Sequence, residues 1–94
     1  MRSLADVIHQ ISECPGVYIV QGVNGRYYTG AARSLRERLR DHLAGRAGRT
    51  KNQRPLALIH IEVCPSYRDA MVRERFLKTG RGRREIQAGQ TVLP

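Results

Sequence analysis

Two polar side chains stand one helical turn apart near the middle of the chain. Arg38 and His42 are four residues apart in a segment whose leucines repeat at helical spacing, so both point to one face of a helix, beside its buried stripe. A guanidinium holds a phosphate with its planar fork, and an imidazole moves a proton near neutral pH. The alternative is a solvated helix face, because Arg36 and Arg40 have the same spacing.

An acidic residue stands out in a later, basic segment. Glu74 lies between Arg73 and Arg75, and intrahelical pairing with Lys78, four residues on, is a sufficient structural explanation. The carboxylate can also hold a hard divalent cation against a phosphate, because such a cation needs only one or two carboxylates and completes its shell with water. The spacing leaves both interpretations open.

Three of the four tyrosines lie in one stretch, GVYIVQGVNGRYYTG, which begins at Gly16. Side chains alternate along a strand, so Tyr27 and Tyr28 point to opposite faces of the expected hairpin. If Tyr18 shares a face with Tyr28, their hydroxyls can converge; cross-strand aromatic packing is the alternative. Tyr27, on the other face, is expected to be a packing residue.

The elements that must position these side chains can be predicted from periodicity and end signals. Helices are expected over Leu4 to Ile11, Ser34 to Gly45 and Ser66 to Lys78, and strands over Val17 to Val20, Arg26 to Thr29 and Leu56 to Cys64. Ser34-x-x-Glu37 and Ser66-x-x-Asp69 are capping boxes, and Asn24-Gly25 is a hairpin turn signal. RGRREIQAG is expected to add one more helical turn.

Alternation and helical spacing also predict which side chains are buried. The third strand is expected to place Ala57, Ile59, Ile61 and Val63 on one face and Leu58 and His60 on the other. The helix after Ser66 is expected to form its apolar side from Ala70, Met71, Val72, Phe76 and Leu77.

Length and charge limit what the protein can be. Its 94 residues form a single domain over 1–94, and the formal net charge is +9 with fifteen of the seventeen basic residues arginine. A polyanionic partner, nucleic acid first, is therefore expected. Cys14 and Cys64 lie fifty residues apart, which favours reduced, mostly buried thiols over a disulfide or zinc site. No apolar run is long enough for a membrane helix, and a cytoplasmic location is expected.

The order of the singled-out residues is similar to that of a known family. Gly16-Val17-Tyr18, Tyr28-Thr29-Gly30, Arg38, His42 and Glu74 resemble the motifs of the GIY-YIG nucleases. The resemblance covers residues 16–85, and SLRERLRDH, the T-x-x-x-R-P that begins at Thr50, and RERFLKTGRGRREI look like small stand-alone bacterial members. The chain is also similar to the N-terminal domain of the UvrC excinuclease subunit.

The resemblance implies an α+β fold, with a small central three-stranded antiparallel sheet flanked by helices, and a metal-dependent endonuclease. Glu74 would ligate one Mg²⁺ or Mn²⁺, and Arg38 would hold the phosphate. Tyr18 or His42 would help to deprotonate the attacking water, and Tyr28 would orient water or phosphate.

The expected partner is DNA, plain, branched, nicked or carrying a flap, with RNA and a protein partner as further possibilities. Backbone binding is expected from seven basic residues: Arg33, Arg36, Arg40, Arg46, Arg49, Lys51 and Arg54. One rival interpretation is a non-catalytic nucleic-acid-binding module with the same fold. Another is an RNA-directed or ribosome-associated role. The oligomeric state is left open.

The chain departs from the family pattern in four places. Val17 and Thr29, the middle residues of the two motif triplets, replace the usual isoleucine of the family motifs (or valine, in the second). Both are β-branched, which suits a strand. Ala31 stands where some relatives have a polar or basic residue. Many relatives also have a late asparagine near the metal, whereas this chain has none after Asn52 and offers Gln87 as the nearest amide.

Overall fold

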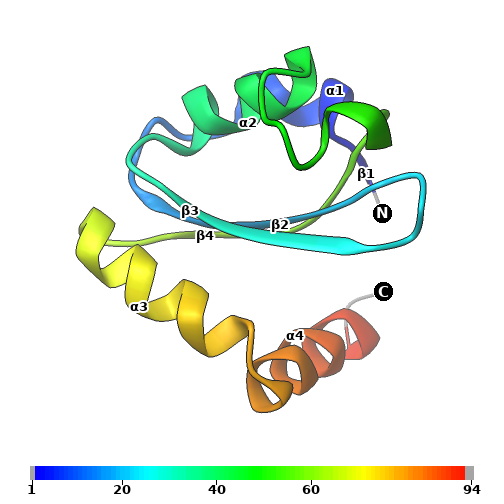
Figure 1. The fold of residues 1–94 in the computed structure, drawn as a ribbon. Coiled ribbons are helices and arrows are strands. Elements are labelled where there is room, and N and C mark those ends of the chain that lie inside the picture. Colours follow the sequence, from blue (N-terminus) through cyan, green and yellow to red (C-terminus); the bar gives the residue numbers. More distant parts are fainter. Residues whose placement is uncertain (1, 93–94) are drawn as a thin grey trace.

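A four-stranded antiparallel sheet separates two layers of helices (Figure 1). The computed structural model describes residues 2–92, and side chains up to residue 87. The elements are β1 (Arg2–Ser3), α1 (Leu4–Val7), β2 (Gly16–Gln21), β3 (Tyr27–Ala32), α2 (Leu35–Ala44), β4 (Ala57–Val63), α3 (Tyr67–Leu77) and α4 (Gly80–Val92), with 3-10 turns at Ile8–Gln10 and Lys51–Gln53. α1 and α2 cover one face of the sheet, and α3 and α4 the other.

The α+β expectation is confirmed, but the sheet has one strand more than predicted. The strand order is β1-β4-β2-β3, so β3 lies at one edge. The extra strand is the two-residue β1, in which Arg2 pairs with Leu58 and Ser3 with Ala57. A strand this short carries no readable alternation, and the helix that was expected from Leu4 to Ile11 is an α-helical turn followed by a 3-10 turn.

The helix ends follow their predicted caps. The Ser34 side chain accepts a hydrogen bond from the Glu37 backbone, and α2 ends at Gly45, whose φ of 81° is left-handed. Ser66 accepts in the same way from Asp69 at the start of α3. These caps fix which residues of α2 and α3 face the sheet.

The hairpin sets two tyrosines on one face, as expected. Val20 pairs with Tyr28 and Tyr18 with Gly30, and residues directly opposite each other share a face in an antiparallel pair. The connection is a five-residue loop rather than the predicted two-residue turn. Such a turn needs positive φ at both of its central residues, and in this loop only Gly25 has a positive φ, at 82°. The Asn24 side chain instead accepts from the Arg26 backbone at 3.0 Å.

A β-bulge in β4 makes the predicted alternation wrong. Along β2, the pairing passes from His60 directly to Leu58, so Ile59 is an extra residue. Leu58 therefore packs with Ile61 in the core on the α2 side, and Ile59 packs on the α3 side. A bulge depends on the partner strand, and no pattern within β4 indicates it.

Two apolar clusters hold the helical layers to the sheet. The cluster under α2 contains Leu4, Val7, Ile11, Tyr18, Val20, Ala32, Leu35, Leu39 and Leu56, and the cluster under α3 and α4 contains Val17, Ile19, Ala70, Leu77 and Ile86. The predicted burial of Met71 and Val72 is wrong: they are 36% and 62% exposed. α3 meets the sheet along Ala70 and Leu77, with Phe76 packed against the same cluster as predicted, whereas Met71 and Val72 lie outside this contact.

The C-terminal helix is longer than predicted. RGRREIQAG lies within α4, a helix of 13 residues rather than one turn. Both cysteines are free thiols as expected, although Cys14 is exposed rather than buried. Within residues 2–92, no helix combines the length and apolar composition needed to cross a membrane.

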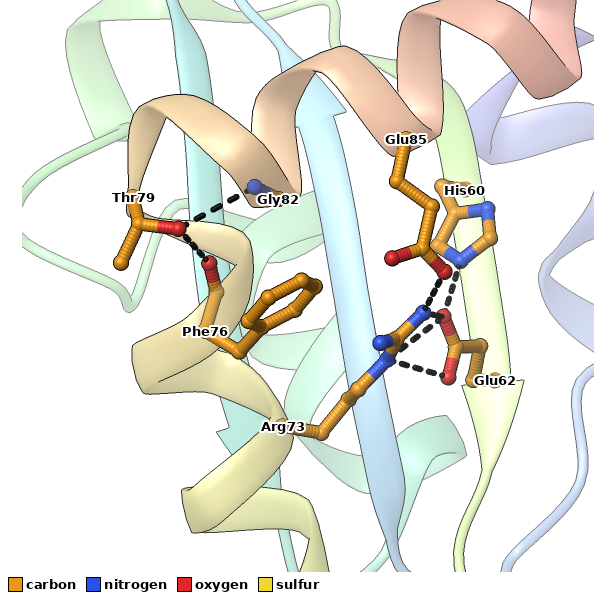
Figure 2. A network of polar contacts seen from close by, with 7 residues as sticks. All are labelled: His60, Glu62, Arg73, Phe76, Thr79, Gly82 and Glu85. Carbon is orange, nitrogen blue, oxygen red and sulfur yellow. Dashed lines mark hydrogen bonds and ion pairs between the residues drawn. The ribbon is translucent and has the colours of Figure 1, made fainter.

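A charged network ties α3 and α4 to β4 (Figure 2). Arg73 of α3 donates through Nε to Glu62 Oε1 at 3.0 Å, and through Nη2 to Glu85 Oε1 of α4 at 2.7 Å. His60 Nε2 lies 2.6 Å from the other Glu62 oxygen. Burial acts to raise the pKa of Glu62, but hydrogen bonds from Arg73 and His60 outweigh it and lower the pKa overall. The network thus fixes the helix that carries Glu74.

Removing Arg73 should destabilise the fold more than removing an exposed arginine of the same helix. The Glu62 side chain is about a quarter exposed, and Arg73→Ala removes its main partner. We therefore expect a loss of about 2 kcal/mol in the free energy of unfolding at pH 7. Arg75→Ala, the matched control, should change it by less than about 0.5 kcal/mol. Urea denaturation measures both.

The effect should also depend on pH. A carboxylate whose pKa is lowered by folding stabilises the fold above its unfolded pKa, and that contribution is lost as the pH falls through the folded value. The stability difference between the parent and Arg73→Ala should therefore shrink in acid. Equal losses for Arg73→Ala and Arg75→Ala at pH 7 would show that the network does not hold α3.

Candidate active site

A cavity of about 180 Å³ opens at the edge strand β3, where the two helical layers approach each other. All five residues singled out for chemistry line it: Tyr18, Tyr28, Arg38, His42 and Glu74. They come from β2, β3, α2 and α3. The loop after α2 adds Arg49 and Thr50 to the lining. We call this cavity the Tyr18 cavity.

A buried chain of hydrogen bonds runs through three side chains of the Tyr18 cavity. The Tyr18 hydroxyl lies 2.8 Å from His42 Nε2, and His42 Nδ1 lies 2.7 Å from Thr50 Oγ1. Their exposed fractions are only 3%, 4% and 0%. Sequence reasoning assigned Thr50 no role, although it begins the T-x-x-x-R-P segment. Both ring nitrogens of His42 are thus occupied by protein partners.

Gly30 makes room for the Tyr18 hydroxyl. It pairs directly with Tyr18 across the hairpin, and a Cβ built at position 30 would overlap the hydroxyl and the end of the ring. The last residue of the second motif triplet is therefore a glycine for a steric reason. A larger residue there would force the phenol away from its place beside His42.

Burial sets the protonation states of His42 and Tyr18. Desolvation, helped by the positive charge of Arg38, lowers the pKa of His42 to about 4. Burial also raises the pKa of Tyr18, against the opposing effects of a hydrogen bond and positive charge from Arg38. Near pH 7 the imidazole is therefore neutral and the phenol keeps its proton. When His42 donates from Nδ1 to Thr50, its Nε2 lone pair is free to accept from Tyr18.

Tyr28 is held at the mouth of the Tyr18 cavity by two contacts. Asn24 donates its side-chain amide to the Tyr28 hydroxyl at 2.9 Å. The Arg49 guanidinium lies over the ring, 5.6 Å from its centroid. Sequence reasoning assigned Asn24 only to the turn, but its side chain also orients this hydroxyl.

Arg38 and Glu74 bring opposite charges to the Tyr18 cavity. The Arg38 side chain is 45% exposed, and its nearest acidic atom is an Asp41 oxygen at 3.9 Å, so its fork is accessible to an anion. Glu74 makes the expected pair with Lys78 at 3.3 Å and also lines the cavity. The two interpretations of Glu74 are therefore compatible, because a pair with a half-exposed lysine is weak.

The Tyr18 cavity offers few protein ligands to a divalent cation. Among the described residues, no group of three or more His, Cys, Asp or Glu side chains gathers as a metal site. Among the residues that the structure describes, Glu74 is the one carboxylate in the lining of the cavity. Mg²⁺ commonly takes one or two carboxylates and fills its shell with water and phosphate oxygens, so one carboxylate is sufficient to hold it against a substrate.

Two of the seven predicted binding residues border this region. Arg49 lines the Tyr18 cavity itself. Arg33 lies over the Tyr67 ring at 4.3 Å, in a shallow hollow that shares Ala31 and Arg38 with the Tyr18 cavity.

The other five lie elsewhere or are held by the protein. Arg36 donates to a backbone carbonyl before β2 at 2.7 Å, and Arg54 donates to a carbonyl near the end of α2 at 3.4 Å. Arg46 pairs with an aspartate of α2 at 2.8 Å. Arg40 and Lys51 are exposed. The structure therefore gives Arg36 and Arg54 structural contacts that the basic pattern did not reveal.

The predicted stand-in for the late asparagine is not in the Tyr18 cavity. Gln87 lines a neighbouring hollow instead. An amide that does contact a residue lining the Tyr18 cavity is that of Asn24, which donates to the Tyr28 hydroxyl.

Comparisons with known proteins agree with this geometry. A model of the GIY-YIG catalytic domain matches residues 14–87, and the chain belongs to the GIY-YIG family. Among its relatives are small proteins designated UPF0213. One from Pseudomonas aeruginosa is 34% identical over 86 residues, covering 88% of this chain and 83% of the relative. One from Staphylococcus haemolyticus is 38% identical over 64 residues, covering 67% and 78%. No solved structure matches the chain.

His42 should titrate well below an ordinary histidine. We expect its NMR pH titration to have a midpoint at about 4, and near 6.5 in the urea-unfolded chain, which serves as the control. Arg38→Gln should raise the folded midpoint, because it removes a repelling positive charge. A folded midpoint near 6.5 would contradict the buried, neutral imidazole.

The same depressed pKa links stability to pH. Between the folded pKa of about 4 and the unfolded value near 6.5, the unfolded chain binds more protons, so stability rises with pH. The contribution is therefore present above about pH 6.5 and lost toward pH 4, by roughly 3 kcal/mol over the full range.

Proposed function

We propose that this protein is a metal-dependent endonuclease that hydrolyses phosphodiester bonds of DNA. The observation that carries the proposal is the Tyr18 hydroxyl, held beside a neutral imidazole in a cavity that also contains Arg38 and Glu74. Hydrolysis of an anionic diester needs positive charge, a proton acceptor and fixed geometry, and the Tyr18 cavity supplies all three. Membership of the GIY-YIG family supports a nucleic-acid substrate.

Tyr18 is the group that contacts the attacking water. His42 cannot do so directly, because both of its ring nitrogens are bonded to protein atoms. As water attacks phosphorus, its proton passes to the Tyr18 oxygen, and the phenol proton passes to His42 Nε2. The phosphorus bond to the leaving oxygen breaks, and that oxygen takes a proton from solvent. The buried imidazole thus acts as the proton acceptor through Tyr18.

The phosphate is positioned by the cations of the Tyr18 cavity. Arg38 presents its fork from α2, and Arg49 approaches from the loop over Tyr28. Two arginines offset the charge that grows on the phosphate oxygens. The Tyr28 hydroxyl, fixed by Asn24, orients the phosphate or the water. These contacts read the backbone and not the bases, which predicts little sequence specificity.

Glu74 is the residue that would hold Mg²⁺ or Mn²⁺. Its carboxylate lines the Tyr18 cavity from α3, opposite the α2 residues. A bound divalent cation would supply Lewis acidity at a phosphate oxygen and screen the charge on the leaving group. On holding the cation, Glu74 would give up its weak pair with Lys78, and the lysine ammonium would become available to the nucleic acid.

Plasmid nicking tests the proposal. Supercoiled plasmid incubated with protein and Mg²⁺ or Mn²⁺ should be nicked, and Glu74→Ala and Arg38→Ala should abolish nicking. Tyr18→Phe, which removes only the hydroxyl, should lower the rate by about 100-fold or more. Intact plasmid with salt-sensitive binding would instead support a non-catalytic module, and preferential binding of RNA in competition would support an RNA-directed role.

The salt dependence of DNA binding tests which basic residues contact phosphates. On duplex DNA, log affinity should fall with log salt concentration by about 0.9 for each phosphate contacted. Arg49→Gln should therefore reduce the slope by about one unit. Arg40→Gln, on the same helix as Arg38 but outside the lining of the Tyr18 cavity, should reduce it by less. Equal slopes for the parent and Arg49→Gln would show that Arg49 does not contact a phosphate of the bound DNA.

A further inference from the structure

A second and larger hollow adjoins the Tyr18 cavity. Its volume is about 560 Å³, and it lies on the other side of β3, between the β2–β3 hairpin and the α3 and α4 layer. Thr29 and Arg49 line both spaces. The two spaces are therefore neighbours, so a polymer strand whose phosphate sits beside Tyr18 has this hollow next to it. We call it the Tyr27 hollow.

The lining of the Tyr27 hollow combines an apolar floor with a cationic rim. Ile19, Leu77 and Ile86 are buried and form the floor. Arg26, Arg49, Lys78 and Arg83 supply positive charge, and no acidic side chain lines the hollow among the residues the structure describes. This composition suits a ligand with a flat apolar part and several negative charges. A short piece of nucleic acid strand has both.

Tyr27 supplies a flat surface in this hollow. It was expected to be a packing residue, but it is 49% exposed and lines the open space, so its ring is not covered by the protein. It lies on the same face of β3 as Thr29, two strand residues or roughly 7 Å away. An exposed tyrosine ring in a hollow that arginines also line is the kind of platform on which unpaired bases stack.

We propose that the Tyr27 hollow binds an unpaired nucleobase adjacent to the cleaved phosphate. This proposal rests on the proposed function and narrows its substrate to nucleic acid with single-stranded nucleotides beside the scissile bond. A base stacked and paired within a duplex has no free face to offer Tyr27, so it must leave the stack to enter. The rim cations then hold the phosphates on either side. Tyr27 thereby makes the site selective for structure rather than for sequence.

Binding in EDTA tests the proposal without depending on cleavage. Fluorescence anisotropy is measured for three labelled probes: a blunt duplex, the same duplex with a short single-stranded overhang, and that overhang with abasic sites. The parent should bind the base-containing overhang about 10-fold more tightly than the abasic one, within the range of roughly 5-fold to 150-fold expected for one stacked base.

Variants of Tyr27 test whether its ring causes the preference for bases over abasic sites. Tyr27→Ala should lose the preference for bases over abasic sites while its affinity for the blunt duplex stays within about 2-fold. Tyr27→Phe keeps the ring and should keep the preference. Val72→Ala removes another exposed apolar side chain, from the far side of α3, and is the matched control.

The outcomes separate this proposal from the proposed function. A parent protein with no preference for bases, or a Tyr27→Ala variant that retains it, overturns the Tyr27 hollow as a base site even if the protein nicks plasmid. A base preference that needs Tyr27 in a protein that cuts nothing supports the hollow and overturns the endonuclease. Failure to bind any probe overturns both.

Discussion

The site depends on the contact between the Tyr18 hydroxyl and His42, in the space that Gly30 leaves open. Three elements must agree for this contact to form. The hairpin register sets Gly30 opposite Tyr18, the cap at the start of α2 turns His42 toward the sheet, and the loop after α2 places Thr50 behind the imidazole. A shift of one residue in the hairpin would send the phenol to the other face.

The same contact joins two neutral groups inside a cavity that also has charged side chains in its lining. Burial keeps His42 unprotonated and Tyr18 protonated, so the pair neither repels a cation nor pays to desolvate a charge of its own. The charged groups, on Arg38, Arg49 and Glu74, line the same cavity. In the proposed mechanism, proton transfer would take place between the buried neutral groups, and the phosphate would bind at these charged side chains.

Local signals made much of this structure predictable. The two Ser caps, the glycine end of α2 and the alternation in the hairpin each act within a few residues, and each is present as expected. The features that were missed depend on distant neighbours. The bulge at Ile59 depends on β2, and the two-residue β1 forms only because β4 offers an open edge. Similarly, Thr50 gains its role only once folding brings α2 and its loop together.

Substitution at position 30 tests the dependence of activity on this contact most directly. Gly30→Ala adds a single methyl group whose nearest neighbours are atoms at the far end of the Tyr18 side chain, so the fold should survive while the hydroxyl moves. We predict a cooperative thermal transition by circular dichroism and a nicking rate about 100-fold below that of the parent, the scale expected when a reacting group is misplaced by about 1 Å. A folded Gly30→Ala protein that nicks plasmid at the parent rate would contradict the account.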